Sequence, residues 1–349
     1  MKNNIIFFSR SSLRSNRLLF EFHKFLVNVI LEGYDVKMVW YGGRFDRVLK
    51  KLRLYSIYLR IIHLLTKPKL ILFMDESSSS MLAPKIKKIF SSTTVNISHA
   101  LVSYHPFYKN INFDYYFVYG EKCIENADHF GIELNSTKII PIGPLYASVK
   151  LLLRSANIDD NLVIALSRAK KFNLRICVTS QWWSTESSAA NLLVIYTALA
   201  DYIAANENIF FYIKPHPLER DKKSPLLKTY SYDNVLALSA ESSIKDLAGV
   251  VDLHFTWSSN SVIDFALIGI PSVFLRFNTD TIEKYGILPP RYGLVVDETA
   301  GLDDIVRNKR YSKADAEKIL HHNTDGCGFD SILHFRKAIG MILGDKPPT

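Results

Sequence analysis

The sequence predicts an α/β protein built from two parallel β-sheets, and three observations carry this prediction. The chain has 349 residues, which suits two domains of about 150 residues each better than a single core. Short apolar runs rich in β-branched and aromatic residues alternate with longer amphipathic patterns, as strands and helices do around parallel sheets. This alternation stops near residues 141–144 and resumes at Leu174, which predicts a boundary between the two sheets.

The first half contains six runs that are typical of buried strands. They are Ile5–Phe8, Val36–Tyr41, Leu70–Met74, Thr94–Ile97, Tyr115–Tyr119 and Lys138–Ile142. Two stretches between them, Leu18–Leu31 and Met81–Phe90, have the apolar spacing of helices. Because ligands of such sheets bind at the carboxyl ends of the strands, polar residues that directly follow a strand are candidate site residues.

The second half repeats this alternation. The predicted strands are Leu174–Thr179, Ile209–Ile213, Val235–Leu238, Val251–Phe255, Ser272–Leu275 and Leu294–Val296, and the predicted helices are Ser187–Ala204 and Ser261–Ile268. We therefore expect one domain over residues 1–150 and a second over residues 151–330. A last helix over residues 331–349 has the option of packing back on the first domain.

Composition limits the class of partner. Hydrophobic residues make up 48% of the chain and charged residues 22%, as in soluble globular proteins. The formal net charge of +9 favours anionic partners such as nucleotides, phosphorylated lipids or acidic glycans. Nucleic acid is not expected, because no nucleic-acid-binding motif is present and the basic residues are scattered. Three cysteines without CxxC spacing (Cys123, Cys177 and Cys327) indicate a reducing cytoplasm.

Membrane contact is left open at one segment. No window approaches 18 uncharged apolar residues, so no membrane span is expected, and the N-terminus is typical of a first strand rather than a secretory signal. Residues 47–73, however, mix Arg and Lys with Leu, Ile and Tyr. A helix there either rests its basic, aromatic face on the inner face of the cytoplasmic membrane, or packs on a sheet with a solvated charged face.

Lys214–Pro215–His216–Pro217 directly follows a predicted strand. Each proline fixes its own φ and keeps the preceding residue out of helical space, so the turn stays extended. Lys214 and His216 are thereby presented at the ligand edge of the sheet. The alternative is a rigid turn whose polar residues are incidental.

A second polar stretch precedes a predicted helix. Ser258, Ser259, Asn260 and Ser261 lie between a strand and the apolar pattern 262–268. Ser and Asn are favoured N-cap residues, and a helix start fed by a strand offers free N–H groups to a phosphate. A plain cap needs one such residue, and four exceed that need. Asp264, one turn later, either meets a ribose hydroxyl or complements the helix dipole.

KPHP together with the downstream SSNSVIDFALIGIPSVF resembles the C-terminal domain of GT-B glycosyltransferases that build bacterial surface polysaccharides. These include capsule sialyl- and polysialyltransferases, Kdo transferases and, more distantly, CDP-glycerol glycerophosphotransferases. The resemblance implies a GT-B fold, in which two Rossmann-like domains face a central cleft, with an N-terminal acceptor domain and a C-terminal nucleotide-sugar donor domain. It implies that His216 hydrogen-bonds the donor phosphate and that Ser258, Ser259 and Ser261 complete the pocket.

Further candidates follow other strands. Gln181 and Trp182 approach the nucleotide in this interpretation, and Trp182 either stacks on a base or covers the core; Glu241 is a candidate ribose or base contact. Arg10 and Arg14 either clamp an anionic acceptor or donor carboxylate, or belong to a solvated basic loop.

Asp75, Glu76 and His99 are the candidates for the base or nucleophile, with helix capping or structural hydrogen bonding as the alternative. Inverting sialyltransferases carry an acidic pair followed by Gly, and teichoic acid polymerases a His-Gly pair. Here Ser77 follows the acids and Ala100 follows His99.

Together these features predict a cytoplasmic glycosyltransferase. It would move a sugar from a nucleotide donor, first of all CMP-linked Kdo or sialic acid, to a glycan or lipid-linked glycan of the bacterial surface. We expect no metal ion and no cofactor, because Lys214, His216 and the helix dipole take the place of a metal. The alternatives are a CDP-glycerol-type polyol-phosphate transferase and a non-catalytic nucleotide-sugar-binding module.

Overall fold

The computed structural model describes residues 4–10, 17–41, 54–74, 83–98, 100, 111–135, 137–153, 166–180, 186–216, 225–239, 242–257, 259–277, 294–324 and 330–344. Contacts divide the chain into two compact units. The first comprises Met1–Leu153 and Asn323–Thr349, and the second comprises Arg154–His322.

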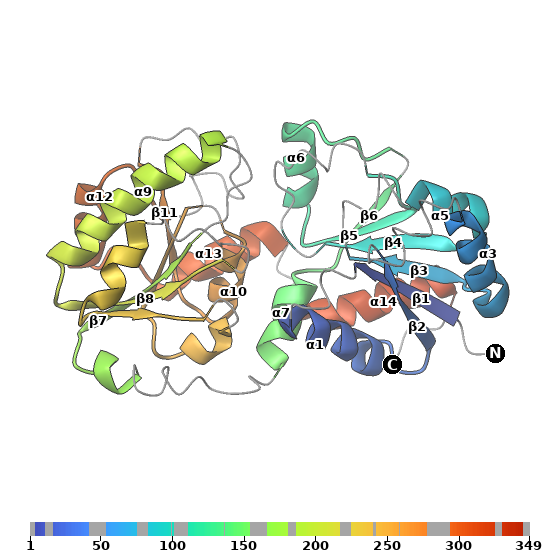
Figure 1. Cartoon of the computed structure of the whole chain (residues 1–349), viewed down its shortest axis with the longest axis horizontal. Helices are drawn as coiled ribbons and strands as arrows, with labels where there is room; N and C mark the ends of the chain where they lie inside the picture. The colour runs from blue at the N-terminus through green and yellow to red at the C-terminus, as the bar shows by residue number, and fades with distance from the viewer. Residues whose placement is uncertain are drawn as a thin grey trace. The chain divides into compact units, whose positions relative to one another are not determined.

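The first unit contains a six-stranded parallel sheet (Figure 1). Its strands are β1 (Asn4–Arg10), β2 (Asp35–Tyr41), β3 (Leu70–Phe73), β4 (Thr93–Ile97), β5 (Tyr115–Val118) and β6 (Lys138–Pro141). Their order is β2-β1-β3-β4-β5-β6, and every neighbouring pair is parallel. The chain thus leaves β1 in one direction to form β2 and returns to form β3 on its other side. This reversal makes β1/β3 the topological switch point of the sheet.

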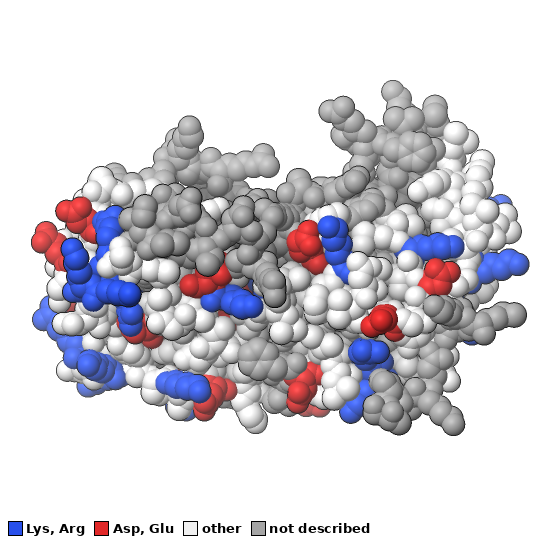
Figure 2. All heavy atoms as spheres, turned by 90° about the horizontal axis from the view of Figure 1, so that it is seen from below, with Lys and Arg blue, Asp and Glu red and all other residues white. Residues whose placement is uncertain are grey.

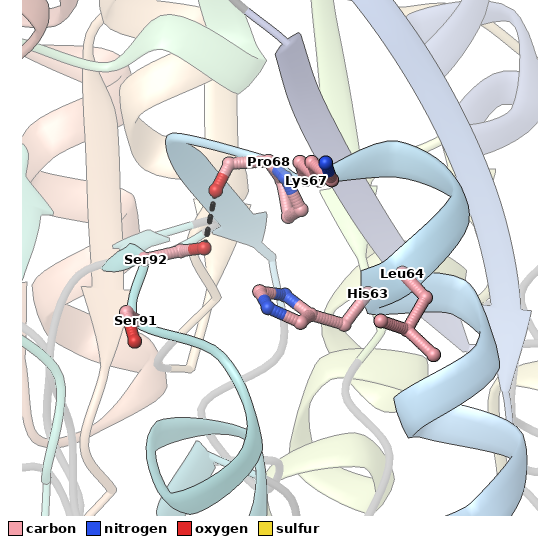
Figure 3. Close-up of a pocket in the computed structure, with 6 residues that line it drawn as sticks. All are labelled: His63, Leu64, Lys67, Pro68, Ser91 and Ser92. Atoms are coloured by element: carbon pink, nitrogen blue, oxygen red, sulfur yellow. Dashed lines mark hydrogen bonds between the residues drawn. The ribbon is translucent and has the colours of Figure 1, made fainter.

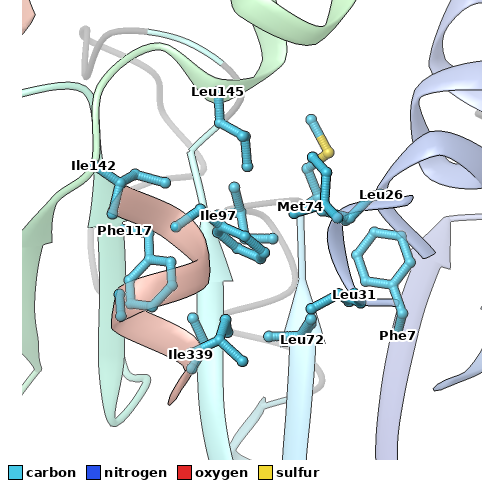
Figure 4. Packing of buried hydrophobic residues seen from close by; sticks show 14 of the residues in the cluster. Phe7, Leu26, Leu31, Leu72, Met74, Ile97, Phe117, Ile142, Leu145 and Ile339 are labelled. Carbon is cyan, nitrogen blue, oxygen red and sulfur yellow. The ribbon is translucent and has the colours of Figure 1, made fainter. Parts of the chain in front are cut away.

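Helices cover both faces of this sheet. They are α1 (Arg17–Phe25), which continues into the π-helical turn η2 (Leu26–Ile30), α3 (Tyr55–Thr66), α5 (Ala83–Ile89), α6 (Lys122–His129), α7 (Leu145–Leu152) and α14 (Ser331–Leu343). The core on one face joins alternate strand residues such as Phe7 and Phe117 to α7 and α14, with Leu145 and Ile339 among its members (Figure 4). The last helix of the chain therefore packs in the core of the first unit.

The second unit contains another six-stranded parallel sheet. Its strands are β7 (Leu174–Thr179), β8 (Ile209–Lys214), β9 (Val235–Ala237), β10 (Leu253–Thr256), β11 (Ser272–Leu275) and β12 (Leu294–Val296). Their order, β12-β11-β10-β7-β8-β9, is the 3-2-1-4-5-6 order of the doubly wound dinucleotide-binding fold. The strands are mostly buried apolar runs, as expected for a parallel sheet covered on both faces. The switch point lies between β7 and β10.

The helical elements of this unit are α9 (Glu186–Ala205), η3 (Pro225–Ser231), η4 (Ile244–Leu247), α10 (Ser261–Leu267), α12 (Thr299–Arg307) and α13 (Lys313–Thr324). One face of the sheet packs Cys177, Phe210 and Tyr212 against Phe265 of α10 and the η4 segment. The side chains of α9 supply further buried apolar residues, among them Leu192, Ile195 and Leu199.

All twelve predicted strands are present, and their ends agree with the predicted ends to within two residues. The predicted helix Leu18–Leu31 is split, because its second part widens into a π-helical turn. Among the residues described, no helix has the length and apolarity needed to cross a membrane. On the face shown in Figure 2, basic and acidic side chains are interspersed over the described surface, so the positive net charge is not gathered into a patch there.

Candidate functional site

The candidate site lies at the carboxyl ends of β7, β8 and β10 in the second unit. In the parallel register Thr179 is level with Lys214 on one side and with Thr256 on the other. The last residues of all three strands therefore meet at one edge of the sheet, at its switch point. Doubly wound sheets bind their ligands at this place.

The Lys214–Pro215–His216 segment is fixed to the end of β7. Ser180 donates its backbone N–H to the carbonyl oxygen of Lys214 at 3.0 Å. The backbone N–H of His216 in turn donates to Ser180 Oγ at 2.9 Å. These two bonds hold the turn beside the switch point, where Lys214 ends β8 and His216 follows two residues later. Pro217 lies outside the described residues.

The imidazole of His216 is neutral at pH 7. Burial is the main cause that lowers the pKa of His216, to about 4, and the nearby positive charge of Lys214 lowers it further. A neutral ring carries one N–H donor and one acceptor nitrogen. Among the described residues, the end of β8 therefore carries a cation, Lys214, followed by a neutral imidazole, His216.

A buried polar network lies directly beneath this edge. Thr179 Oγ1 is 2.8 Å from His254 Nε2, 3.0 Å from Ser261 Oγ and 3.1 Å from Thr256 Oγ1. On its other side, His254 Nδ1 is 2.8 Å from Ser272 Oγ. The ring of His254 also stacks on Phe265, with 4.0 Å between the ring centroids. The network thus ties β7, β10, β11 and α10 together through hydrogen bonds.

Hydrogen-bond counting assigns the protons of this network. Thr179 has one hydroxyl proton and donates it to Thr256, so it accepts from both His254 Nε2 and Ser261 Oγ. The His254 tautomer is then Nε2–H, and Nδ1 accepts from Ser272. Because Ser261 gives its proton to Thr179, that proton must rotate before Ser261 can donate to a phosphate.

The start of α10 differs from the expectation of free N–H groups. Ser261 N–H donates to Ser259 Oγ at 3.2 Å, Val262 N–H to the Ser259 carbonyl at 3.2 Å and Ile263 N–H to the Asn260 carbonyl at 3.1 Å. These donors are satisfied within the first turn, and the Asn260 side chain makes no cap bond. An anion here would therefore be held mainly by side chains. Ser259 Oγ accepts the N–H of Ser261, which leaves its own proton for a ligand.

Asp264 lies in the first turn of α10 and is buried. The other residues predicted for the nucleotide pocket, Gln181, Trp182, Glu241 and Ser258, lie outside the described residues. Gln181 and Trp182 follow Ser180 at the end of β7, and Ser258 follows Trp257 after β10.

The remaining candidates belong to the first unit. Arg10 is the last residue of β1, and its side chain is not among those described. Arg14, Asp75, Glu76 and His99 lie outside the described residues. The chain positions are nevertheless informative, because β1 and β3 flank the switch point of the first sheet. Arg10 ends β1, and Asp75 comes two residues after the end of β3.

His254, Thr256 and Ser272 were not among the residues predicted for the site. Their signal in the sequence is a polar side chain inside an otherwise apolar strand. All three are buried, and a buried polar group needs a hydrogen-bond partner. The partner of each residue depends on the strand order, which the sequence pattern alone does not supply.

Acid is expected to destabilise the folded state, because burial lowers the pKa of His254 as well as that of His216. Burial also lowers the pKa of His254, to about 3, which is below the ordinary value of 6.5. Protonation therefore favours the unfolded chain. The stabilising contribution is complete above about pH 6.5 and is lost as the pH falls toward the folded pKa. For His254 we expect a loss on the order of 2 kcal/mol of unfolding free energy between pH 7 and pH 5.

Urea unfolding at pH 7 and pH 5 measures this loss. In His254→Gln, which has no titrating group at this position, the loss of unfolding free energy between pH 7 and pH 5 should be smaller by about 2 kcal/mol. His321→Gln, at an exposed position of α13, is the control for removing a histidine. An equal loss in wild type and His254→Gln would show that His254 does not contribute to the acid sensitivity.

A separate hollow of about 300 Å³ lies in the first unit (Figure 3). It is lined by His63, Leu64, Lys67, Pro68, Ser91 and Ser92. Pro68 precedes β3 and Ser92 precedes β4, so the hollow is at the amino ends of the strands. This is the edge opposite to the one where parallel sheets bind their ligands.

The described residues contain no group of three His, Cys, Asp or Glu side chains placed to hold a metal ion. No protein-family model matches the sequence, and no curated protein is significantly similar to it.

Solved structures, in contrast, match the whole chain. The MnaA structure from S. aureus with UDP superposes with a TM-score of 0.65 and 13% identity, over 100% of this chain and 99% of that chain. A glycosyltransferase from Rickettsia africae gives 0.58 and 10% identity, over 99% of this chain and 100% of that chain. The wall teichoic acid polymerase TagF with CDPG gives 0.53 and 13% identity, over 97% and 88%. These matches and the two parallel sheets confirm the predicted GT-B class of α/β fold.

Proposed function

We propose that this chain is a glycosyltransferase that takes a sugar from a nucleotide donor and that holds the donor phosphate at the β7/β8/β10 edge. The observation that carries the proposal is the pairing of Lys214 with a neutral, half-buried His216 at the switch point of a 3-2-1-4-5-6 sheet. A lysine cation, an imidazole N–H and the Ser259 hydroxyl are all donors to phosphate oxygens. The full-length matches to proteins with nucleotide ligands support the same interpretation.

The chemical task of this cluster would be to stabilise the leaving group. As an acceptor oxygen attacks the anomeric carbon, the bond from that carbon to the donor phosphate oxygen breaks and its electron pair remains on the phosphate. Donors that are already oriented stabilise this charge without reorganisation. Ser180 would act indirectly, because its hydroxyl holds the backbone of His216.

The acceptor hydroxyl must also lose its proton. For this role we propose Asp75, Glu76 or His99 in the first unit, with Arg10 and Arg14 as contacts for an anionic acceptor or donor carboxylate. Their support is positional: Arg10 ends β1, and Asp75 and Glu76 follow β3 across the switch point of the first sheet. In a retaining mechanism a carboxylate would instead attack the sugar.

A CMP-linked acidic sugar, Kdo or a sialic acid, is the donor that we propose first, with a surface glycan as acceptor. The TagF similarity favours a second candidate, the transfer of a polyol phosphate from a CDP-glycerol-type donor. In that reaction the phosphate travels with the polyol, because the bond between the two phosphates breaks. The mass gained by the acceptor therefore separates the two reactions.

A thermal-shift panel of CMP, CDP, UMP, UDP and GDP tests the proposal. A ligand that binds only the folded state at a hundred times its Kd adds about 2.7 kcal/mol, or roughly 5–10 °C for a domain of this size. We expect CMP or CDP to give the largest rise. A uridine nucleotide in first place would redirect the donor toward UDP-sugars, and no rise with any of the five would contradict the site. Stabilisation without transfer to any acceptor would indicate a non-catalytic binding module.

A further inference from the structure

The outer face of α3 carries a continuous row of exposed apolar side chains. Leu54, Ile57, Ile61, Leu64 and Leu65 are all exposed, up to 69% for Leu64 and 76% for Leu65. The first four are three or four residues apart and Leu65 is four residues after Ile61, which places all five on one side of the helix. On the opposite side Leu59 is buried, and the ring of His63 meets Phe90 edge-on at 4.9 Å. The row therefore faces outward from a helix whose inner side is already packed.

This arrangement differs from one of the two alternatives drawn from the sequence, and it gives the other, contact with a membrane, a mainly apolar face in place of a basic, aromatic one. A helix that only packs on the sheet was expected to present a solvated charged face, yet the outward face is mainly apolar. α3 has 12 residues, too few to span a bilayer. A contact with a membrane through this helix would therefore be peripheral, with the helix lying along the surface.

Among the described residues of α3, α5 and the segments that follow them, the exposed charges have one sign. Arg60, Lys67, Lys69 and Lys88 are exposed, and neither residues 54–69 nor residues 83–92 contain an Asp or Glu. Lys67 lines the same hollow as Leu64, so a cation lies at the end of the row (Figure 3). The charge of Lys87 is compensated by Asp114, at 3.0 Å. An apolar row bordered by cations complements an anionic bilayer, where headgroups meet the cations and acyl chains meet the leucines.

We propose that the outer face of α3 binds the surface of an anionic lipid bilayer. A second copy of the chain fits the same face less well, because a two-fold contact would place the same cation-bordered surface of both copies face to face. The inference goes beyond the proposed transferase activity and does not depend on it. It concerns only the first unit.

The second unit provides a matched control. Leu193 and Val194 on α9 are adjacent apolar residues that are 54% and 55% exposed. The sequence of α9 contains no Lys or Arg. This pair therefore has the exposure of the α3 residues without their row of neighbours and without the cations.

Vesicle cosedimentation of the full chain tests the proposal. We expect binding to phosphatidylcholine vesicles that contain phosphatidylglycerol, and much weaker binding to phosphatidylcholine alone. Leu64→Ser with Leu65→Ser should weaken binding about tenfold or more, because less apolar surface enters the bilayer. Arg60→Gln with Lys67→Gln should weaken binding to the anionic vesicles by about thirtyfold, and added salt should weaken it in wild type. Leu193→Ser with Val194→Ser should leave it unchanged.

Three results would overturn the proposal. One is equal binding to neutral and anionic vesicles. Another is that the Leu64→Ser and Leu65→Ser variant loses as much vesicle binding as the Leu193→Ser and Val194→Ser variant. The third is no vesicle binding together with lipid-free self-association that Leu64→Ser and Leu65→Ser abolish, which would assign the face to a second copy. The three substituted positions on α3 and Lys67, which directly follows it, are exposed, so the thermal unfolding midpoint should stay near that of wild type and report that the variants are folded.

Discussion

His216→Ala is expected to weaken binding of the stabilising nucleotide by roughly ten- to a hundredfold. The variant removes the imidazole N–H that we propose as a donor to the phosphate, and a hydrogen bond to a charged group contributes about 1.5–3 kcal/mol. Turnover should fall at least as much, since the same bond would strengthen as charge develops on the leaving phosphate. Isothermal titration with CMP or CDP measures the first effect, and acceptor mass analysis measures the second.

Two controls make this result specific. His216→Gln keeps an N–H donor and should retain part of the binding, whereas His321→Ala on α13 removes an exposed histidine and should change nothing. Asp75→Ala or Glu76→Ala should lose turnover while keeping nucleotide binding, because these residues are proposed for the acceptor proton. Unchanged CMP and UMP binding in His216→Ala would remove His216 from the site.

The strands were predictable because each is a local signal. Ile209–Ile213, for example, is a run of five buried residues with a lysine directly after it. The KPHP turn was predictable for the same reason, since the prolines fix φ within the turn itself. Local sequence thus supplied the strand ends, and the rule for parallel sheets indicated that these ends bind ligands.

The polar network was not predictable in this way. Thr179 and His254 are 75 positions apart in the chain, and they meet only because β10 lies beside β7 in the sheet. Strand order is decided by the packing of whole elements, so no local pattern reveals such a pair. The same limit explains α10: the sequence correctly placed a helix after the serines, but whether its first N–H groups are free depends on the geometry of one turn. The first turn satisfies them internally.

Phe335→Ala is expected to lower the unfolding free energy of the first unit by about 3–5 kcal/mol. Phe335 is fully buried on α14, and its ring meets that of Phe117 on β5 edge-on, with 5.7 Å between centroids. Alanine would leave a cavity against β5 and remove this aromatic contact. Leu333→Ala is the matched control on the same helix; Leu333 is 44% exposed, so the loss should stay within about 0.5 kcal/mol.

The effects of His216→Ala and Phe335→Ala should be confined to different units of the chain. Phe335 belongs to the core of the first unit, whereas Lys214, His216 and Ser259 belong to the second. Phe335→Ala should therefore shift the urea midpoint but leave the nucleotide Kd unchanged at temperatures where the variant is folded, and His216→Ala should do the reverse. Equal stability losses in Phe335→Ala and Leu333→Ala would contradict the packing of α14. A raised Kd in folded Phe335→Ala would mean that the nucleotide site depends on the first unit as well.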